Sequence, residues 1–400
     1  MRTLLSARLG ADFAKLWAAS AVSNIGDGIT MAAGPLLVAS VSSDPALIAG
    51  AAFAQQLPWL LFALVSGAYV DRLDRRRLVV AVNLARAVAL AALAVTIATE
   101  TVTVAVIYAV VFLLGTGETL ADTAMNALLP SVVVADKLPA ANARLYATFT
   151  IGNQFAAKPL GAWLFVIAAA APFGLNALTF AVSAALVAGI RPTSAPQPQP
   201  RASLRGEIIE GMRWLWRHQL LRTLAASMGL GNIAFCAAFA VFVLYSRQRL
   251  GLSDLGYGFL LTTFAVGGLL GTAIAARLVR AVGSAAVLRT GLVVEVVTHV
   301  TLAVTTSPWV AAGILIVFSI HGMVWGVTVA SLRQRLVPSH LLGRVGSGYA
   351  LLDLGGATLG SLLGGVLASA WEITTPFWIA AVMMTVIAVV AWRPLARAAL

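Results

Sequence analysis

The sequence predicts an all-α integral membrane protein whose helices cross the bilayer twelve times. Of its 400 residues, 60% are hydrophobic and only 10% are charged, whereas soluble domains are about 45–50% apolar and about 25% charged. The apolar residues form continuous runs of about 20, the length that a helix needs to cross a bilayer, without the alternation of β-barrel strands. This pattern excludes soluble and disordered classes. The single cysteine, Cys236, excludes an intrachain disulfide framework.

Twelve runs satisfy the length requirement. Two stretches are longer than one span and are divided at short turns: 159–190 breaks at Ala171-Pro172-Phe173-Gly174, and 296–332 breaks at Ser307-Pro308. In chain order the predicted spans are 13–41, 45–70, 78–99, 101–126, 145–170, 172–190, 222–246, 255–276, 285–305, 308–332, 346–370 and 373–392.

The net charge of +12 is explained by membrane topology rather than by nucleic-acid binding. If the N-terminus is cytoplasmic, nearly every Lys and Arg outside the spans falls on the cytoplasmic side, as the positive-inside rule requires. Arg247 and Arg249 fall in an outer loop, and Arg86 and Lys158 lie within spans. We therefore expect a multi-pass protein of the bacterial cytoplasmic (inner) membrane with both termini inside, no cleaved signal peptide and no nucleic-acid partner.

A polar stretch divides the chain into two halves of six spans, residues 1–190 and 222–400. The linker between them, 191–221, begins with a Pro-rich extended spacer and continues as an amphipathic helix suited to the membrane surface. Two short patterns recur at one offset in both halves: SNI at 23–25 and GNI at 231–233, then LLP at 128–130 and LVP at 336–338. This repetition indicates duplicated halves.

The end of the second span carries GAYVDRLDRRR at residues 67–77. This segment resembles the signature between helices 2 and 3 of the major facilitator superfamily, although it departs from the signature at positions 69, 70 and 74. The resemblance implies a gating motif in which the aspartate latches the outward-open state against the second half. The alternative is that the arginines only set topology and bind anionic lipid headgroups. The matching residues are Gly67, Asp71, Arg72, Arg75 and Arg76.

Other segments resemble the exporter branch of that superfamily that contains enterobactin and macrolide efflux proteins. They include SNIGDG at 23–28, GTGETLADTA at 115–124, ANARL at 141–145 and GMRWLWR at 211–217. The resemblance implies the major facilitator fold, with alternating access about a central cavity and drug:proton antiport without a cofactor. We expect a monomer that contacts membrane lipid.

Ionisable side chains within spans are candidate functional groups, because each costs about 2.5–3.5 kcal/mol at a helix centre. Asp27 and Lys158 fall at the same predicted depth, so we expect them to pair or to share a proton near the midplane. Asn24, Asn153 and Gln154 lie near them in the sequence and are further candidates for contact with proton or substrate.

Lys158 also departs from a family pattern. Residues 151–161 resemble the helix 5 motif of drug antiporters, which has a small residue where this chain has Lys158. The lysine either adapts the site to an anionic compound or forms a salt bridge peculiar to this protein.

The remaining charged groups within spans have competing interpretations. Arg86, Glu118 and Asp122 are interpreted as a structural bridge between the third and fourth spans, with substrate contact as the alternative. His321 is either a core residue or a proton relay. Asp353 is interpreted as a polar helix contact or a gate contact.

Two further patterns in the second half have structural interpretations. Glu295 and His299 lie four residues apart on one helix face, and we expect a structural or lipid-facing role for them. Glycines at 355–356, 360 and 364–365 predict a flat ridge that lets helices pack closely at the seam between the halves.

The predicted function is export of a small amphipathic molecule (a drug, macrolide-like compound or siderophore) by a secondary transporter, in exchange for protons. A metabolite importer or uniporter of the same fold is the first alternative, followed by a polytopic lipid-modifying enzyme and a non-transporting sensor. We expect no enzymatic activity, metal site or cofactor, because the sequence contains no phosphate-loop, dinucleotide, metal-ligand or catalytic-triad pattern.

Overall fold

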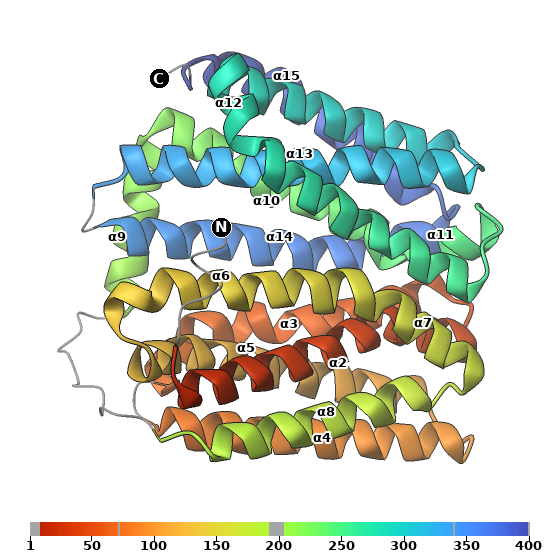
Figure 1. Ribbon diagram of the computed structural model, residues 1–400. Helices are drawn as coiled ribbons and strands as arrows, with labels where there is room; N and C mark the ends of the chain where they lie inside the picture. Colours follow the sequence, from red (N-terminus) through yellow and green to blue (C-terminus); the bar gives the residue numbers. More distant parts are fainter. Residues whose placement is uncertain (1–8, 71–72, 192–203, 339–340, 399–400) are drawn as a thin grey trace. The chain divides into compact units, whose positions relative to one another are not determined.

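The computed structural model describes residues 9–70, 73–191, 204–338 and 341–398, and these ranges contain helices and short connections but no strand (Figure 1). The prediction of an all-α protein is therefore confirmed. In chain order the α-helices are α2 (Ala11–Val41), α3 (Pro45–Val70), α4 (Arg75–Ala98), α5 (Val104–Val132), α6 (Leu138–Thr148), α7 (Ala157–Ile167), α8 (Ala171–Ala188), α9 (Leu204–Arg217), α10 (Gln219–Ala240), α11 (Phe242–Gln248), α12 (Asp254–Val304), α13 (Pro308–Leu336), α14 (Leu342–Ala370) and α15 (Thr375–Ala396).

Within the described ranges, nine helices are long and apolar enough to cross a membrane. This number is consistent with twelve predicted spans, because three spans are present in the structure but add nothing to the count: one of two runs merged in a single helix, one run that is divided, and one helix that is not among the nine. The predicted runs 255–276 and 285–305 are merged in α12. The run 145–170 is divided into α6, the π-helix η2 (Phe149–Ala156) and α7. The run 13–41 is present as α2.

The two irregular spans have local causes. In α12, Gly283 has φ of 82° and ψ of 157°, a backbone conformation that glycine adopts without a side-chain clash, and it separates two helical stretches. In η2, the Ala157 N–H bonds the carbonyl of Gly152, five residues back. Pro159 has no N–H to offer the carbonyl of Phe155, so the regular ladder is interrupted in this region.

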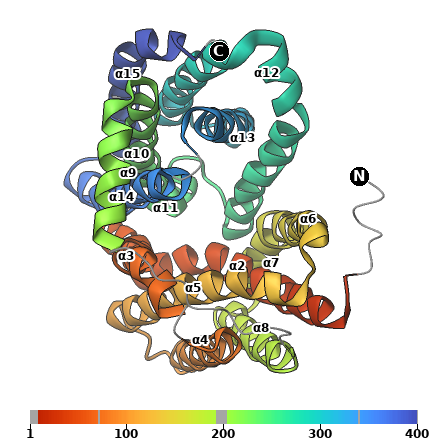
Figure 2. The ribbon, with the colours of Figure 1, turned by 90° about the vertical axis from the view of Figure 1, so that its left-hand side faces the viewer.

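The described helices group into two compact units. Unit 1 comprises residues 1–42, 54–199 and 254–262, and unit 2 comprises residues 43–53, 200–253 and 263–400. In unit 1, α2 packs against α7 and α8, while α4 packs against α5 and α8 (Figure 2). In unit 2, α10 packs against α14 and α15, and α9 packs against α14. The predicted linker helix is therefore present as α9, with Leu215 buried in the core of unit 2.

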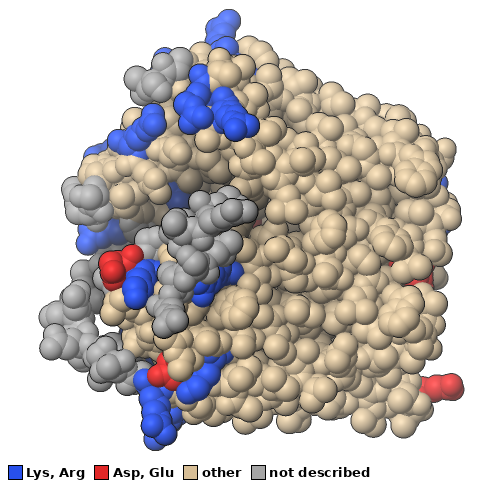
Figure 3. Space-filling view, viewed as in Figure 1, with Lys and Arg blue, Asp and Glu red and all other residues tan. Residues whose placement is uncertain are grey.

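Basic side chains gather at one end of the helices of unit 1. Lys15 Nζ donates to the carbonyl of Gly189 at 2.6 Å, at the end of α8. Figure 3 shows blue Lys and Arg atoms of unit 1 toward the left of the view, where α4 begins and α8 ends. The orientation of the chain in the membrane stays a prediction.

A row of glycines on α14 allows α10 to pack against it backbone to backbone. A Cβ atom added at Gly356, Gly360 or Gly364 would collide with the main chain of α10, at Gly229, Ile233 and Ala237 respectively. The predicted close packing is therefore present. For these three glycines the neighbouring helix belongs to the same half of the sequence. A Cβ atom at Gly365 would instead meet Pro45, Ala46 and Ala49 of α3, in the first half, so the expected packing against the other half is present at Gly365 and not at the other three.

Replacing Gly364 with alanine is expected to lower the free energy of unfolding by about 1–3 kcal/mol, because the added methyl group must push two helix backbones apart. The measurement is unfolding of the purified protein in mixed micelles. Gly322→Ala on α13 is the matched control, because nothing lies within 4 Å of an added Cβ there, and it is expected to change stability by at most about 1 kcal/mol. Equal effects of the two substitutions would contradict the packing argument.

Candidate functional site

Among the described ion pairs of unit 1, the most buried joins Arg86 on α4 to Asp27 on α2. Arg86 Nη2 lies 3.0 Å from Asp27 Oδ1, and the exposed fractions of the two side chains are 6% and 25%. The guanidinium carbon also lies 3.9 Å from the ring centroid of Phe180 on α8. The Arg86 guanidinium is therefore held by a charged hydrogen bond to α2 and by a cation–π contact with α8.

Small residues make the space for this pair. A Cβ atom at Gly117 on α5 would lie 2.7 Å from Cδ of Arg86, so the arginine side chain reaches across a helix face that only glycine leaves open. A Cβ at Gly26 would collide with Asn176 and Thr179 on α8. In the space left by Gly26, Asn176 Nδ2 donates to Thr30 Oγ1 at 2.7 Å. The backbone of α2 is thus held against α8 beside Asp27.

Glu118 and Asp122 on α5 extend the pair into a larger group, which we call the unit 1 charge cluster (Asp27, Arg86, Glu118 and Asp122). Both α5 carboxylates interact electrostatically with Asp27 and with Arg86. Glu118 is half-buried, and Asp122 is exposed. The cluster contains three carboxylates and one guanidinium, so it carries two excess negative charges when every member is ionised. The interpretation of Arg86, Glu118 and Asp122 as a structural bridge between the third and fourth spans stays a prediction, and the structure adds an ion pair that joins Arg86 on α4 to α2.

Lys158 on α7 belongs to a separate polar chain. Its ammonium donates to Gln154 Oε1 at 2.6 Å, Gln154 donates to Asn153 Oδ1 at 2.9 Å, and Asn153 donates to the carbonyl of Asn24 at 2.9 Å. The lysine side chain is buried. This series of hydrogen bonds connects four of the predicted site residues and links α7 through η2 to α2.

The expected pair between Asp27 and Lys158 is wrong, because the two side chains face different helices. Gly28 lies on the face of α2 that packs against Asn153 and Ala157. Asp27 precedes it by one residue, which rotates its side chain by about 100° around the helix axis, and it meets Arg86 instead. The depth of a side chain in the membrane can be predicted by counting residues along its helix. The direction in which the side chain points toward a partner depends on how the helices pack.

The residues of the predicted gating motif are only partly described. Asp71 and Arg72 lie outside the described residues, and Gly67 lies in α3. Arg75 Nη1 donates to the carbonyl of Ala127 at 3.0 Å, and Arg76 Nη1 donates to the carbonyl of Ile190 at 2.9 Å. Both arginines therefore tie the start of α4 to neighbouring helix ends inside unit 1. The gating role of the motif stays a prediction.

In unit 2, the predicted candidates Asp353 and His321 each have a specific partner. Asn232 Nδ2 donates to the Asp353 carboxylate, joining α10 to α14. His321 Nε2 on α13 lies 3.3 Å from Glu295 Oε1 on α12. Sequence reasoning paired Glu295 only with His299, four residues away on the same helix. It missed His321, since nothing in the sequence indicates which faces of two helices meet.

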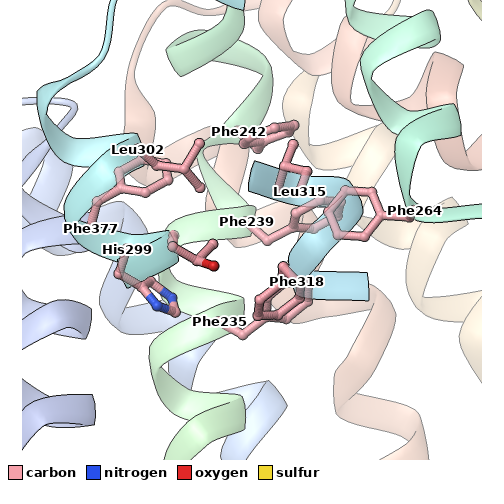
Figure 4. Close-up of a pocket in the computed structure, with 11 residues that line it drawn as sticks. Phe235, Phe239, Phe242, Phe264, His299, Leu302, Leu315, Phe318 and Phe377 are labelled. Atoms are coloured by element: carbon pink, nitrogen blue, oxygen red, sulfur yellow. The ribbon is translucent and has the colours of Figure 1, made fainter. Parts of the chain in front are cut away.

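Unit 2 also contains a pocket walled mainly by aromatic rings (Figure 4). Its empty volume is about 290 Å³. Its rings pack on one another, with centroids 5.3 Å apart for Phe235 and Phe318 and 5.6 Å apart for Phe239 and Phe264. The spacing of phenylalanines at 235, 239 and 242 was the available signal, and sequence reasoning missed it. The remaining lining residues are Ala238, Phe242, Thr298, His299, Leu302, Leu315 and Phe377.

Comparisons with known proteins agree on one class. A family described as transmembrane secretion effector, within the major facilitator superfamily, matches residues 7–398. The multidrug efflux pump Tap of Mycolicibacterium fortuitum is 28% identical over 386 residues, which cover 93% of each chain.

Two solved structures have the same fold over nearly the whole chain. The nucleoside transporter NupG has a TM-score of 0.77 at 12% identity, covering 96% of this chain and 99% of that one. A bacterial homologue of the iron transporter ferroportin has a TM-score of 0.76 at 18% identity, covering 96% of this chain and 98% of that one. At these identities the likeness establishes the major facilitator fold alone.

Proposed function

This chain belongs to the transmembrane secretion effector family of the major facilitator superfamily, and we propose that it exports a small amphipathic molecule in exchange for protons. It is a multi-pass membrane transporter with an all-helical fold. The proposed substrates are a drug, a macrolide-like compound or a siderophore. The proposed location is the bacterial cytoplasmic membrane, with both chain termini in the cytoplasm and the basic helix ends facing the same side.

The unit 1 charge cluster is the observation that carries this proposal. Within the spans the Asp27 carboxylate pairs with the Arg86 guanidinium, and Glu118 and Asp122 interact electrostatically with both. Uncompensated charge in a bilayer is costly. Uptake of a proton by one carboxylate reduces the excess negative charge, and a second proton neutralises the cluster. Asp122 is exposed and Glu118 half-buried, whereas the Arg86 side chain is buried. Such a cluster can bind protons in one state of a transport cycle and release them in another.

The export direction and the substrate class are supported by a relative rather than by the charge cluster. The relative from Mycolicibacterium fortuitum is a multidrug efflux pump. The aromatic pocket in unit 2 is consistent with a substrate that has an apolar part, since phenylalanine rings make up most of its wall. Alternating access by the two halves is part of the proposal, because it would expose one binding region to each side of the membrane in turn.

The test is transport by the full-length chain in inside-out vesicles with an acidic lumen. A panel of fluorescent dyes, macrolides, tetracyclines and catecholate siderophores is offered outside. At least one compound is expected to accumulate in the lumen, and nigericin, which collapses the pH gradient, is expected to stop the accumulation. Vesicles without the protein are the control. Equilibration that ignores the gradient would favour a uniporter, and loss of a preloaded compound from the lumen would favour an importer. Either result would contradict proton-driven export.

A further inference from the structure

Glu295, His299 and His321 form a compact cluster inside unit 2, which we call the Glu–His cluster. His321 Nε2 lies 3.3 Å from Glu295 Oε1, and His299 Nδ1 lies 3.9 Å from Glu295 Oε2. The exposed fractions of the three side chains are 17% for Glu295, 3% for His299 and 9% for His321. The cluster joins two helices, since Glu295 and His299 lie on α12 and His321 lies on α13.

The hydrogen bonds determine where protons sit in this cluster. His299 Nδ1 lies 2.8 Å from the backbone carbonyl of Glu295, and a carbonyl only accepts, so Nδ1 carries a proton. An ionised Glu295 carboxylate likewise accepts from His321 Nε2. Among the described residues, the buried Glu295 Oε2 has no hydrogen-bond partner. With Glu295 ionised and both imidazoles neutral, the cluster has one negative charge, which one added proton cancels.

The site around His321 is closely fitted to its ring. A Cβ atom at Gly291 would lie 2.5 Å from Cε1 of His321 and 3.0 Å from a ring carbon of Trp325. The imidazole also meets Phe318 edge to face, with centroids 6.3 Å apart. His299 lines the aromatic pocket, of which Phe318 is also a wall (Figure 4). Both imidazoles of the cluster are thus largely buried against aromatic groups.

Other ionisable groups of unit 2 near the cluster have partners elsewhere. Arg289 Nε on α12 donates to the carbonyl of Trp392 at 2.8 Å, and Asp353 on α14 accepts from Asn232. Tyr245 on α11 donates to the carbonyl of Leu302 at 2.6 Å. The remaining titratable side chains on helices α10 to α15 are Cys236, Tyr257 and Tyr349 within spans, and Arg222, Arg247, Asp254, Arg277, Arg280, Arg333, Arg335, Arg344 and Arg393 toward the ends of helical stretches, while Arg249 directly follows α11.

From this geometry we propose that the Glu–His cluster is a second proton-binding site, separate from the unit 1 charge cluster, which takes up one proton as the pH falls. The proton binds Glu295 Oε2 or the second ring nitrogen of a histidine, and the product is a neutral group. The expectation that Glu295 and His299 have only a structural or lipid-facing role is replaced by this proposal. A part for the cluster in transport rests on the proposed function, whereas proton binding does not.

The test counts protons released by the full-length protein in lipid nanodiscs between about pH 5 and pH 8, the range in which histidine exchanges protons. Glu295→Gln is expected to release about one proton fewer than the wild type, because no carboxylate remains to stabilise an imidazolium in an apolar site. Glu372→Gln, at an exposed position, is the matched control and is expected to equal the wild type. Equal proton release by Glu295→Gln and wild type would overturn the proposal.

A second measurement does not depend on whether Glu295→Gln folds. In ¹⁵N-histidine NMR of the wild type, the ring signals of His299 and His321 are expected to shift together over the same pH range. Single His299→Gln and His321→Gln variants assign these signals, and His218→Asn removes the signal of a histidine outside the cluster. Unchanged signals of His299 and His321 would overturn the proposal. Absence of proton-driven transport would contradict the proposed function but would leave both titrations unaffected.

Discussion

Replacing Arg86 with leucine is expected to destabilise unit 1 by about 3–5 kcal/mol and to abolish transport, because the substitution leaves the half-buried Asp27 carboxylate inside a membrane span without its counter-ion. The guanidinium pairs with Asp27 at 3.0 Å and interacts with Glu118 and Asp122, and it is the only cation in this cluster. Its contact with Phe180 is lost as well. The measurement is unfolding of the purified protein in mixed micelles, together with uptake into inside-out vesicles.

Two variants separate charge from packing. Arg77→Leu is the control on α4, since the Arg77 side chain is 80% exposed and its ion pair with Asp74 spans 3.6 Å. It is expected to change stability by about 0–1 kcal/mol. The double variant Arg86→Leu with Asp27→Leu is expected to recover part of the lost stability, because it removes both charges of the pair, but to remain inactive. A double variant no more stable than Arg86→Leu would contradict the pair as the cause.

Asp27→Asn is expected to reduce pH-driven export to the rate of vesicles without the protein, while the protein stays folded. The asparagine side-chain oxygen can still accept the hydrogen bond from Arg86, so the packing of α2, α4 and α8 is preserved. The position can no longer bind and release a proton, which removes one member of the proposed exchange site. The measurement is initial uptake at a fixed pH gradient, with thermal unfolding in the same preparation.

Asp44→Asn is the matched control for Asp27→Asn. Asp44 lies before α3, where its side chain accepts from the backbone N–H of Ala46 at 2.8 Å, and asparagine is an equally good acceptor at such a position. This variant is expected to export like the wild type. If Asp27→Asn also exports at the wild-type rate under a pH gradient, Asp27 does not carry the coupling proton. Loss of both folding and transport would instead assign it a structural role.

The helical segments could be predicted because crossing a bilayer is a requirement on composition along the chain. The run 78–99 appears as α4 and the run 373–392 as α15, with ends displaced by a few residues. The interruptions were harder to predict. The π-helix before Pro159 contains a backbone hydrogen bond to a carbonyl five residues back. A pattern of hydrophobic residues does not show which backbone carbonyl each N–H in a helix bonds.

The candidate site could likewise be predicted only in part. Its members were found because an ionisable residue inside an apolar run is visible in the sequence and costly in a membrane. Their partners were not found: Asp27 pairs with Arg86 and not Lys158, and His321 pairs with Glu295. The glycines of α14 show the same limit, since their spacing predicts close packing but not that α10 is the neighbour.

The sequence by itself determined that this protein is a helical membrane transporter of the major facilitator superfamily and which charges its spans carry. The class of protein and the charges within its spans both follow from the order of residues along the chain, because the thickness of the bilayer fixes how many residues a span needs. Only the tertiary structure decided which charges meet. A shift of one residue turns a side chain by about 100° around its helix, so Asp27 and Gly28 face different neighbours, and the packing of whole helices selects the partner of each.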